Sequence, residues 1–179
     1  LHQVVRRQRQ MCIRDRIGTG QNIIYPKIGQ HVDHEAELAL VISKVSKNIS
    51  RENWTEHVLG LTAANDLSER VLQGKTGHFT RAKGFDTFCP LGPFIQTEFT
   101  NNPELNIKAF VNGELKQDGN SRDMIYSIGE ILEFVTSIMT LLPGDVVMTG
   151  TPEGVSQVKP GDEIKIEIET LGTLINSVE

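Results

Sequence analysis

The chain has 179 residues, of which 38% are hydrophobic and 23% charged, with a formal net charge of −5 at pH 7. This composition suits one globular domain with a real core, and the absence of repeats or sustained heptads excludes collagen-like and coiled-coil classes. No run approaches the roughly 18 apolar residues of a membrane span, and the negative charge does not attract nucleic acid, so we expect neither partner. The two cysteines, Cys12 and Cys89, are too few for a disulfide framework, which favours a reducing compartment and a cytoplasmic protein.

Residues 1–16 differ in charge from the rest of the chain. They hold five arginines and one aspartate, so the remainder has a net charge of −9. They lack the apolar core of roughly 7–15 residues that a signal peptide needs. A basic arm for nucleic acid or a membrane surface fits the segment, and so does a non-native junction fused to a truncated reading frame. We favour the junction, exclude residues 1–16 from the fold, and expect one catalytic domain over residues 17–179.

Beyond this segment the pattern predicts short strands with few helices. Residues 36–43 form a continuous apolar run, which is typical of a strand buried on both faces, and residues 60–65 form a second extended run. Ser50 can cap a short helix that continues to about Leu59, and residues 68–75 predict a helical turn.

The middle of the chain predicts a hairpin and one longer helix. Asn112 and Gly113 are a turn signal between two extended runs. Ser127 and Glu130 have the spacing of a capping box, and apolar residues follow at helical spacing as far as Leu142. We therefore expect a β-hairpin followed by an amphipathic helix.

The last third of the chain adds strands and indicates the fold class. Residues 146–150 follow a Pro-Gly-Asp turn, and residues 163–169 alternate isoleucine with charge as a half-exposed strand does. Many short strands, few helices and no regular strand–helix alternation favour an α+β, mainly β fold over a doubly wound sheet.

Two acidic residues, Glu35 and Glu37, stand at the entry to the apolar run at 36–43. Successive strand side chains point to opposite faces, so these two carboxylates share one face. They repel each other unless something positive holds them, and a hard divalent cation such as Mg²⁺, Ca²⁺ or Mn²⁺ suits carboxylate oxygens. A solvated strand end whose acids pair with lysines fits the same spacing, so both interpretations stay open.

The segment NDLSERVLQGK at residues 65–75 carries a second group of charges. If Asp66 ends a strand and the next turn is helical, Arg70 and Gln73 lie on one face and can donate hydrogen bonds to an anionic ligand. Asp66 could then supply a third carboxylate. An aspartate that only caps a helix fits this pattern equally well.

Lys83 and the turn at residues 149–155 offer further polar groups. Lys83 lies between a polar loop and an apolar strand. A lysine there either extends to solvent along apolar surface or acts as a partly buried group that transfers a proton or polarises a carbonyl. The turn TGTPEGV follows a strand directly, and its backbone N–H groups and hydroxyls can bind a carboxylate.

Six segments resemble the fumarylacetoacetate hydrolase family, and they occur in the family's order from about residue 20 to the C-terminus. They are HEAELALVIS, LTAANDLSERVLQGK, RAKGFDTFCPLGP, VNGELKQDGNSRDMIYSI, LLPGDVVMTGTPEGV and PGDEIKIEIETLGTLINSV. Each segment alone is weak evidence, but six in register are highly specific. The resemblance is greatest to small members of the acylpyruvate hydrolase and 2-hydroxyhepta-2,4-diene-1,7-dioate isomerase type. It implies a mixed β-roll with short flanking helices and a homodimer.

The resemblance also implies a metal site. The family's ExE pair matches Glu35 and Glu37, and the aspartate of its ND-x-S-x-R motif matches Asp66. Together these three side chains would hold one Mg²⁺ or Mn²⁺, with waters or substrate oxygens completing the coordination.

Four more positions match family residues at the substrate site. Arg70, Gln73 and Thr151 match residues that bind the substrate, and Lys83 matches the lysine that contacts its oxygens and assists catalysis. The family resemblance therefore implies a divalent-metal-dependent hydrolase, lyase or isomerase that acts on small 2-oxo acids, such as acylpyruvates, through a metal-stabilised enolate.

One departure from the family pattern bears on activity. Relatives begin with an N-Y-x-x-H-x-x-E motif whose His and Glu activate the attacking water, and this motif does not occur here. His34 does not belong to that motif; it matches a family position just before Glu35 and Glu37, where relatives carry His, Tyr or Trp. The sequence thus resembles an N-terminally truncated member, and the alternative function is a metal-binding but catalytically impaired fragment.

Overall fold

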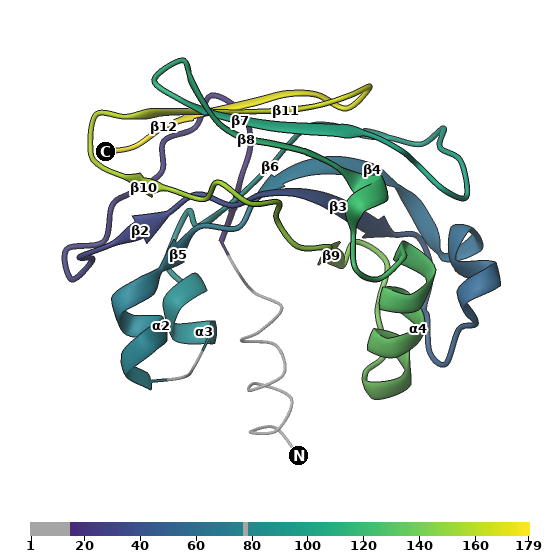
Figure 1. The fold of residues 1–179 in the computed structure, drawn as a ribbon. Helices are drawn as coiled ribbons and strands as arrows, with labels where there is room; N and C mark the ends of the chain where they lie inside the picture. Colours follow the sequence, from purple (N-terminus) through teal and green to yellow (C-terminus); the bar gives the residue numbers. More distant parts are fainter. Residues whose placement is uncertain (1–14, 77–78) are drawn as a thin grey trace.

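Two curved sheets lie over one another in the computed structural model, which describes residues 15–76 and 79–179 (Figure 1). The five-stranded sheet has the order β1 (Arg16–Ile17), β6 (Cys89–Gln96), β4 (Val58–Asn65), β3 (Ala36–Ile42) and β9 (Val146–Met148). The four-stranded sheet has the order β12 (Gly172–Ser177), β11 (Glu163–Ile168), β7 (Asn106–Val111) and β8 (Glu114–Asn120).

A small third sheet and short helices flank the two larger sheets. The small sheet has the order β10 (Gln157–Val158), β2 (Val32–Asp33) and β5 (Ser68–Glu69). The helices are η1 (Arg51–His57), α2 (Arg70–Thr76), α3 (Phe79–Lys83), η2 (Ser121–Asp123) and α4 (Ile128–Ile138). In Figure 1, α2 and α3 lie below one end of the five-stranded sheet and α4 below the other. None of the helices in the described residues is long and apolar enough to cross a membrane.

The fold class is confirmed as mainly β, with a mixed sheet. β1 pairs with β6 in parallel, while β3, β4, β6 and β9 pair antiparallel. Every residue of β3 is buried, which confirms the prediction from its continuous apolar run. The core fills the space between the two larger sheets, because isoleucines of β7 and β11 pack with leucines of β3 and β12 in one cluster.

The hairpin and the long helix also agree with the sequence. Asn112 and Gly113, both with positive φ, join β7 to β8. Helix α4 begins at a capping box in which the Ser127 side chain accepts from the Glu130 N–H and the Glu130 carboxylate accepts from the Ser127 N–H. The helix ends at Ile138, four residues before the predicted end at Leu142.

The prediction of a helix from Ser50 to Leu59 was wrong in type and length. The segment is the 3₁₀ helix η1, and the Ser50 side chain makes no capping hydrogen bond. Strand β4 begins already at Val58, because this residue pairs with Ile42 of β3. Pairing with a neighbouring strand therefore overrides the local helical signal.

Residues 1–14 of the excluded segment lie outside the described residues. Its last two residues belong to the fold: Arg16 pairs with Cys89 in the β1–β6 ladder, and the Asp15 carboxylate accepts from the Thr87 N–H at 3.1 Å. Residues 15 and 16, which the sequence pattern places outside the fold, thus pair with it.

Buried Glu69 joins the small sheet to helix α2. Its Oε1 accepts from the Gln30 and His31 N–H groups at 2.9 and 3.0 Å, and its Oε2 accepts from the Leu72 N–H at 2.5 Å. Burial alone would raise the pKa of this carboxyl, but the three N–H donors outweigh burial and lower the pKa. The ionised carboxylate therefore stabilises the segment that carries Arg70.

We predict that Glu69→Gln lowers the free energy of unfolding by about 1–3 kcal/mol at neutral pH, because an amide cannot accept from all three donors. A carboxyl with a lowered folded pKa contributes stability above its unfolded value near 4.5 and loses it as pH falls through the folded value. The difference from the unaltered chain should therefore shrink in denaturant titrations below pH 4.5. Exposed Glu104 provides the control, and a Glu69→Gln curve that matches Glu104→Gln would contradict the prediction.

Candidate metal and substrate site

Three buried carboxylates, from Glu35, Glu37 and Asp66, converge at one end of the five-stranded sheet. One carboxylate oxygen of each lies within 4.8 Å of one oxygen of the other two. The register explains the convergence, because Ala36 of β3 pairs with Asn65 of β4 and the flanking acids therefore meet. The Asp66 N–H donates to the Glu35 carbonyl oxygen at 2.9 Å, so backbone pairing continues past the strands.

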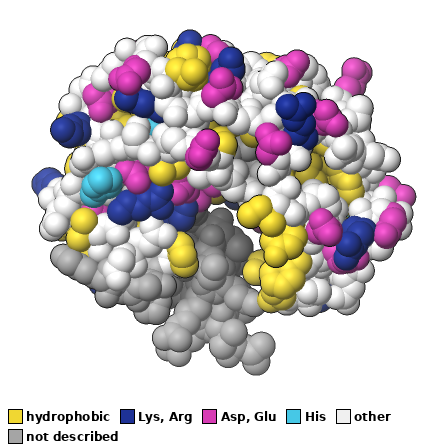
Figure 2. Space-filling view, in the orientation of Figure 1, with side chains coloured by type: hydrophobic (Ala, Val, Ile, Leu, Met, Phe, Trp, Pro, Cys, Tyr) yellow, Lys and Arg dark blue, Asp and Glu magenta, His cyan; other side chains and the backbone are white. Residues whose placement is uncertain are grey.

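Two basic side chains contact this group of acids from the helices. The Lys83 ammonium, at the end of α3, lies 2.8 Å from Glu35 Oε2 and 2.5 Å from Asp66 Oδ2. The Arg70 guanidinium, at the start of α2, lies 2.5 Å from Glu35 Oε1 and 2.7 Å from Asp33 Oδ2. Figure 2 shows basic side chains beside acidic ones and a histidine at the left of the molecule, over β2 and α2.

The basic side chains lie on the solvent side of the acids. The Arg70 and Lys83 side chains are 28% and 19% exposed, whereas those of Glu35 and Asp66 are 9% and 11% exposed. A dissolved anion therefore meets positive charge first. Such an entrance suits a carboxylate-bearing ligand.

Glu37 differs from its two neighbours because, among the described residues, no basic side chain lies within ion-pair distance of its carboxylate. Its Oε2 accepts from the Gly150 N–H at 2.6 Å. The pKa of Glu37 is raised to about 7, first by burial and then by the nearby Asp66 and Glu35 carboxylates, while the Gly150 N–H and the Lys83 ammonium act in the opposite direction. Among the three carboxylates, Glu37 is therefore the one whose negative charge is least compensated by basic side chains.

The three carboxylates fit a divalent cation on their own geometry and chemistry. Their oxygens are hard ligands of the kind that Mg²⁺ and Mn²⁺ take, and their mutual distances allow contact with a single ion. A cation would also relieve the repulsion that raises the pKa of Glu37. The expectation that these three carboxylates converge, which rests on strand spacing and on the family resemblance, agrees with their placement.

Gln73 and Thr151 lie near this group, but their polar atoms already have partners. Gln73 Oε1 accepts from Arg70 Nη1 at 3.0 Å, so the expected shared helix face is present. The Thr151 hydroxyl donates to the Ala36 carbonyl oxygen and accepts from Gln117 Nε2, both at 2.8 Å. A hydrogen bond donated by Thr151 to a ligand would replace the bond to Ala36.

Two residues of this region were not among the sequence candidates. Asp33 binds the Arg70 guanidinium, and its Oδ1 lies 2.9 Å from His31 Nε2. Gln117 is fully buried in β8 and contacts the turn at residues 149–155. The odd spacing of 33, 35 and 37 could have indicated Asp33, whereas no local signal indicates Gln117.

The described histidines lie apart from the three carboxylates. His34 is buried with Nε2 3.0 Å from Ser156 Oγ, and burial lowers its pKa. His31 pairs with Asp33, which also binds the Arg70 guanidinium. His78 is outside the described residues.

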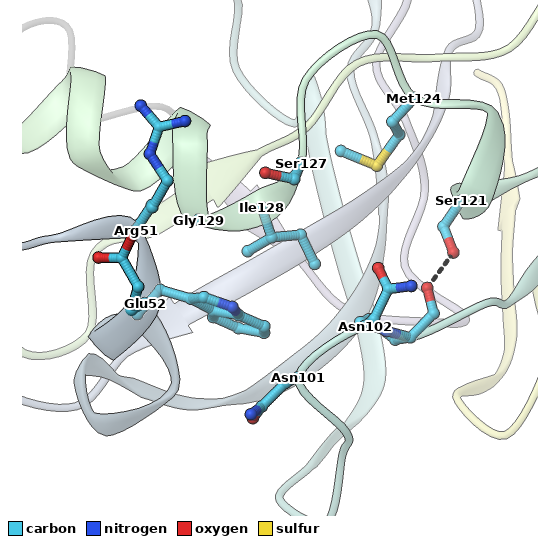
Figure 3. A pocket seen from close by; sticks show the side chains of 11 residues that line it. Arg51, Glu52, Asn101, Asn102, Ser121, Met124, Ser127, Ile128 and Gly129 are labelled. Atoms are coloured by element: carbon cyan, nitrogen blue, oxygen red, sulfur yellow. Dashed lines mark hydrogen bonds between the residues drawn. The ribbon is translucent and has the colours of Figure 1, made fainter.

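A second cavity, of about 300 Å³, lies between η1 and the start of α4 (Figure 3). Its floor is apolar and includes Trp54 and Ile128. Two of its polar lining side chains already have partners: Arg51 pairs with two glutamates of α4, and the Ser121 hydroxyl donates to the Pro103 carbonyl oxygen. Reactive side chains gather at the three carboxylates and not here.

Comparisons with known proteins show the family to which this fold belongs. The family described as fumarylacetoacetate (FAA) hydrolase C-terminal matches residues 14–179. A mitochondrial oxaloacetate tautomerase of Bos taurus is 43% identical over 173 residues, covering 90% of this chain and 55% of that protein. A 5-carboxymethyl-2-hydroxymuconate delta-isomerase from Mycobacterium smegmatis has a TM-score of 0.89 at 42% identity, with 91% of this chain and 65% of that chain covered.

A structural neighbour contains a metal ion. Maleylpyruvate hydrolase from Sphingobium sp. SYK-6, in complex with manganese(II) and pyruvate, has a TM-score of 0.83 at 37% identity, with 91% of this chain and 60% of that chain covered. The chain spans between 55% and 65% of the length of these three relatives. By its fold, its sequence and the extent of the match, the chain belongs to the fumarylacetoacetate hydrolase family, of which it holds the C-terminal domain.

Proposed function

We propose that the chain is a divalent-metal-dependent enzyme that acts on small 2-oxo acids of the acylpyruvate and oxaloacetate type. The observation that carries the proposal is the convergence of Glu35, Glu37 and Asp66 beneath two basic side chains. Such an arrangement suits a cation and a ligand that bears both a carboxylate and a carbonyl group. The Mn²⁺ and pyruvate named for the structural neighbour support the same chemistry.

In this proposal Glu35, Glu37 and Asp66 hold one Mg²⁺ or Mn²⁺. A bound cation supplies Lewis acidity that stabilises negative charge developing on a substrate oxygen. Arg70 binds the substrate carboxylate by paired N–H donors, and Gln73 keeps the guanidinium oriented through its 3.0 Å bond. The turn that carries Thr151 closes the other side of the site.

Lys83 is the proposed catalytic residue. Its ammonium is held by Glu35 and Asp66, so it faces the same ligand space as the cation. There it can donate a proton or a hydrogen bond to the substrate oxygen on which charge develops. Decarboxylation of oxaloacetate needs only stabilisation of the enolate left when CO₂ departs, whereas its tautomerisation also needs a group or a water molecule that takes the C3 proton.

The alternative is a metal-binding but catalytically impaired fragment of such an enzyme, which binds cation and ligand without turning the ligand over. The observation that favours it is the engagement of His34, which is buried and whose Nε2 lies 3.0 Å from Ser156 Oγ. A general base that activates water typically contributes about 10²–10⁴ in rate, so its absence would selectively slow hydrolysis.

The deciding assay follows oxaloacetate tautomerisation and decarboxylation and acylpyruvate cleavage, with Mn²⁺ or Mg²⁺ and after chelation. We expect metal-dependent enolisation and slow cleavage, compared with a full-length relative. Turnover that persists after chelation would contradict the proposed function. Binding of Mn²⁺ and pyruvate with no turnover of either substrate would establish the alternative.

For the metal site we predict that Glu37→Gln lowers Mn²⁺ affinity about tenfold or more while raising the stability of the metal-free chain above pH 7. The substitution removes a ligand and also a buried, unneutralised charge. Calorimetric titration with Mn²⁺ and denaturant unfolding measure the two effects. Glu56→Gln, a change at an exposed pair with Lys44, is the control and should alter neither. Unchanged Mn²⁺ affinity in Glu37→Gln would remove this residue from the site.

For Lys83 we predict that Lys83→Met abolishes most turnover but leaves Mn²⁺ affinity equal or higher. The ammonium contacts oxygens of Glu35 and Asp66 and therefore competes with a cation for them. Mn²⁺ titration and steady-state kinetics on the same preparation separate the two effects, with exposed Lys44→Met as the control. Weaker Mn²⁺ binding would mean that Lys83 supports the metal site instead of competing with it.

The homodimer and the absence of nucleic-acid and membrane partners stay predictions. Sedimentation velocity of the chain at micromolar concentration is the measurement for the first.

A further inference from the structure

The fully buried side chain of Gln117 connects the two larger sheets beside the acid group. It projects from β8, the edge strand of the four-stranded sheet, toward the start of β3. Its Oε1 accepts from the Ala36 N–H at 3.0 Å. Its Nε2 donates to Thr151 Oγ1 and to the Pro152 carbonyl oxygen, each at 2.8 Å. The Gln117 amide therefore donates both of its hydrogens to the turn and accepts one from β3.

These bonds close a ring around Ala36, the residue between the two glutamates. The Thr151 hydroxyl donates to the Ala36 carbonyl oxygen at 2.8 Å, while the Ala36 N–H donates to Gln117. Strand β9 pairs with β3 only as far as Ala39. At Ala36, two side chains thus replace the missing strand partner and satisfy its backbone groups.

The turn at residues 149–155 fits closely against β8 on both sides of Gln117. A Cβ on Gly154, which has a φ of +97°, would lie 2.0 Å from the Lys116 carbonyl oxygen. A Cβ on Gly119 would lie 2.6 Å from Cβ of Pro152. The glycines allow an approach that other residues would prevent, so the amide of Gln117 reaches the turn directly.

The same turn supplies the N–H group that Glu37 uses. Gly150 donates to Glu37 Oε2 at 2.6 Å. Its neighbours are both tied to β3, because the Thr149 hydroxyl donates to the Leu38 carbonyl oxygen and the Thr151 hydroxyl to that of Ala36. The position of the Gly150 N–H is therefore set by the bonds on each side of it.

We propose that Gln117 is a positioning residue, whose amide clamps the turn at 149–155 onto β3 and thereby fixes the Glu37 carboxylate for cation binding. The inference rests on the proposed function, since it assigns Glu37 to the metal site. It predicts an effect on metal affinity and not only on stability. Groups that orient metal ligands typically change affinity by about 10–100-fold when they are removed.

The test compares Gln117→Met, Thr151→Val and the double variant with a matched control. Thr136 is equally buried, and its hydroxyl donates to Leu132 and accepts from the Ile49 N–H in and near helix α4. Thr136→Val therefore removes one donated and one accepted hydrogen bond of a hydroxyl in helix α4, as Thr151→Val does in the turn. Each variant is measured for melting temperature, for Mn²⁺ affinity by calorimetry, and for hydrogen exchange at the Gly150 amide.

We expect about a tenfold or greater loss of Mn²⁺ affinity in Gln117→Met and Thr151→Val, and less than additive loss in the double variant, because both break one ring. Exchange at Gly150 should accelerate in the same variants. Thr136→Val should lower the melting temperature with Mn²⁺ affinity within about twofold of the unaltered chain.

Two results would overturn the proposal, and they differ from failure of the proposed function. The first is a Mn²⁺ affinity in Gln117→Met equal to that in Thr136→Val. The second is unchanged exchange at Gly150 in Gln117→Met, which would show that the amide does not hold the turn. Absence of Mn²⁺ binding by the unaltered chain would instead reject the metal site itself, and Gly150 exchange would then still decide whether Gln117 holds the turn.

Discussion

Burial of negative charge at the junction of β3 and β4 is the constraint on which the site depends. Glu35, Glu37 and Asp66 are all removed from water, which is costly for carboxylates unless positive charge compensates. Arg70 and Lys83 form ion pairs with Glu35 and Asp66. Glu37 has no such pair among the described residues, and its pKa is raised. The fold tolerates this arrangement because a network of hydrogen bonds holds each acid in place, and such a network is the usual setting for a metal ion.

Side chains alternate along residues 33–38, so that one set of residues contributes the carboxylates of the site and the other set binds the turn beside it. Residues 33, 35 and 37 direct their carboxylates toward Arg70, Lys83 and the Gly150 N–H. The intervening residues 34, 36 and 38 bind residues 149–156 through side-chain or backbone groups. A one-residue slip of this strand would exchange the two sets, so the register of β3 against β4 protects the function as well as the core.

The sequence predicted those parts of the site that local pattern encodes. Glu35 and Glu37 are two residues apart on a strand, and that spacing is enough to place both carboxylates on one face. Arg70 and Gln73 are three apart on a helix, and their side chains do meet. The strands, the hairpin and the capping box likewise follow from patterns of a few residues, which is why most of the fold could be predicted. The helix at Ser50 failed because pairing of Val58 with β3, a long-range contact, determined where the strand begins.

What could not be predicted depends on contacts between distant parts of the chain. Gln117 is 81 residues from Ala36 and 34 from Thr151, and a glutamine in a hairpin strand is ordinarily a solvated residue. Gln117 becomes a buried partner of Ala36 and Thr151 only because the curved sheets bring β8 over the start of β3. The same holds for Lys83, whose sequence position fitted an exposed lysine as well as a functional one. The Lys83 ammonium pairs with Glu35 and Asp66, because buried carboxylates attract any positive charge that the fold brings within reach. This long-range pairing, which the local sequence does not encode, distinguishes Lys83 from an exposed lysine.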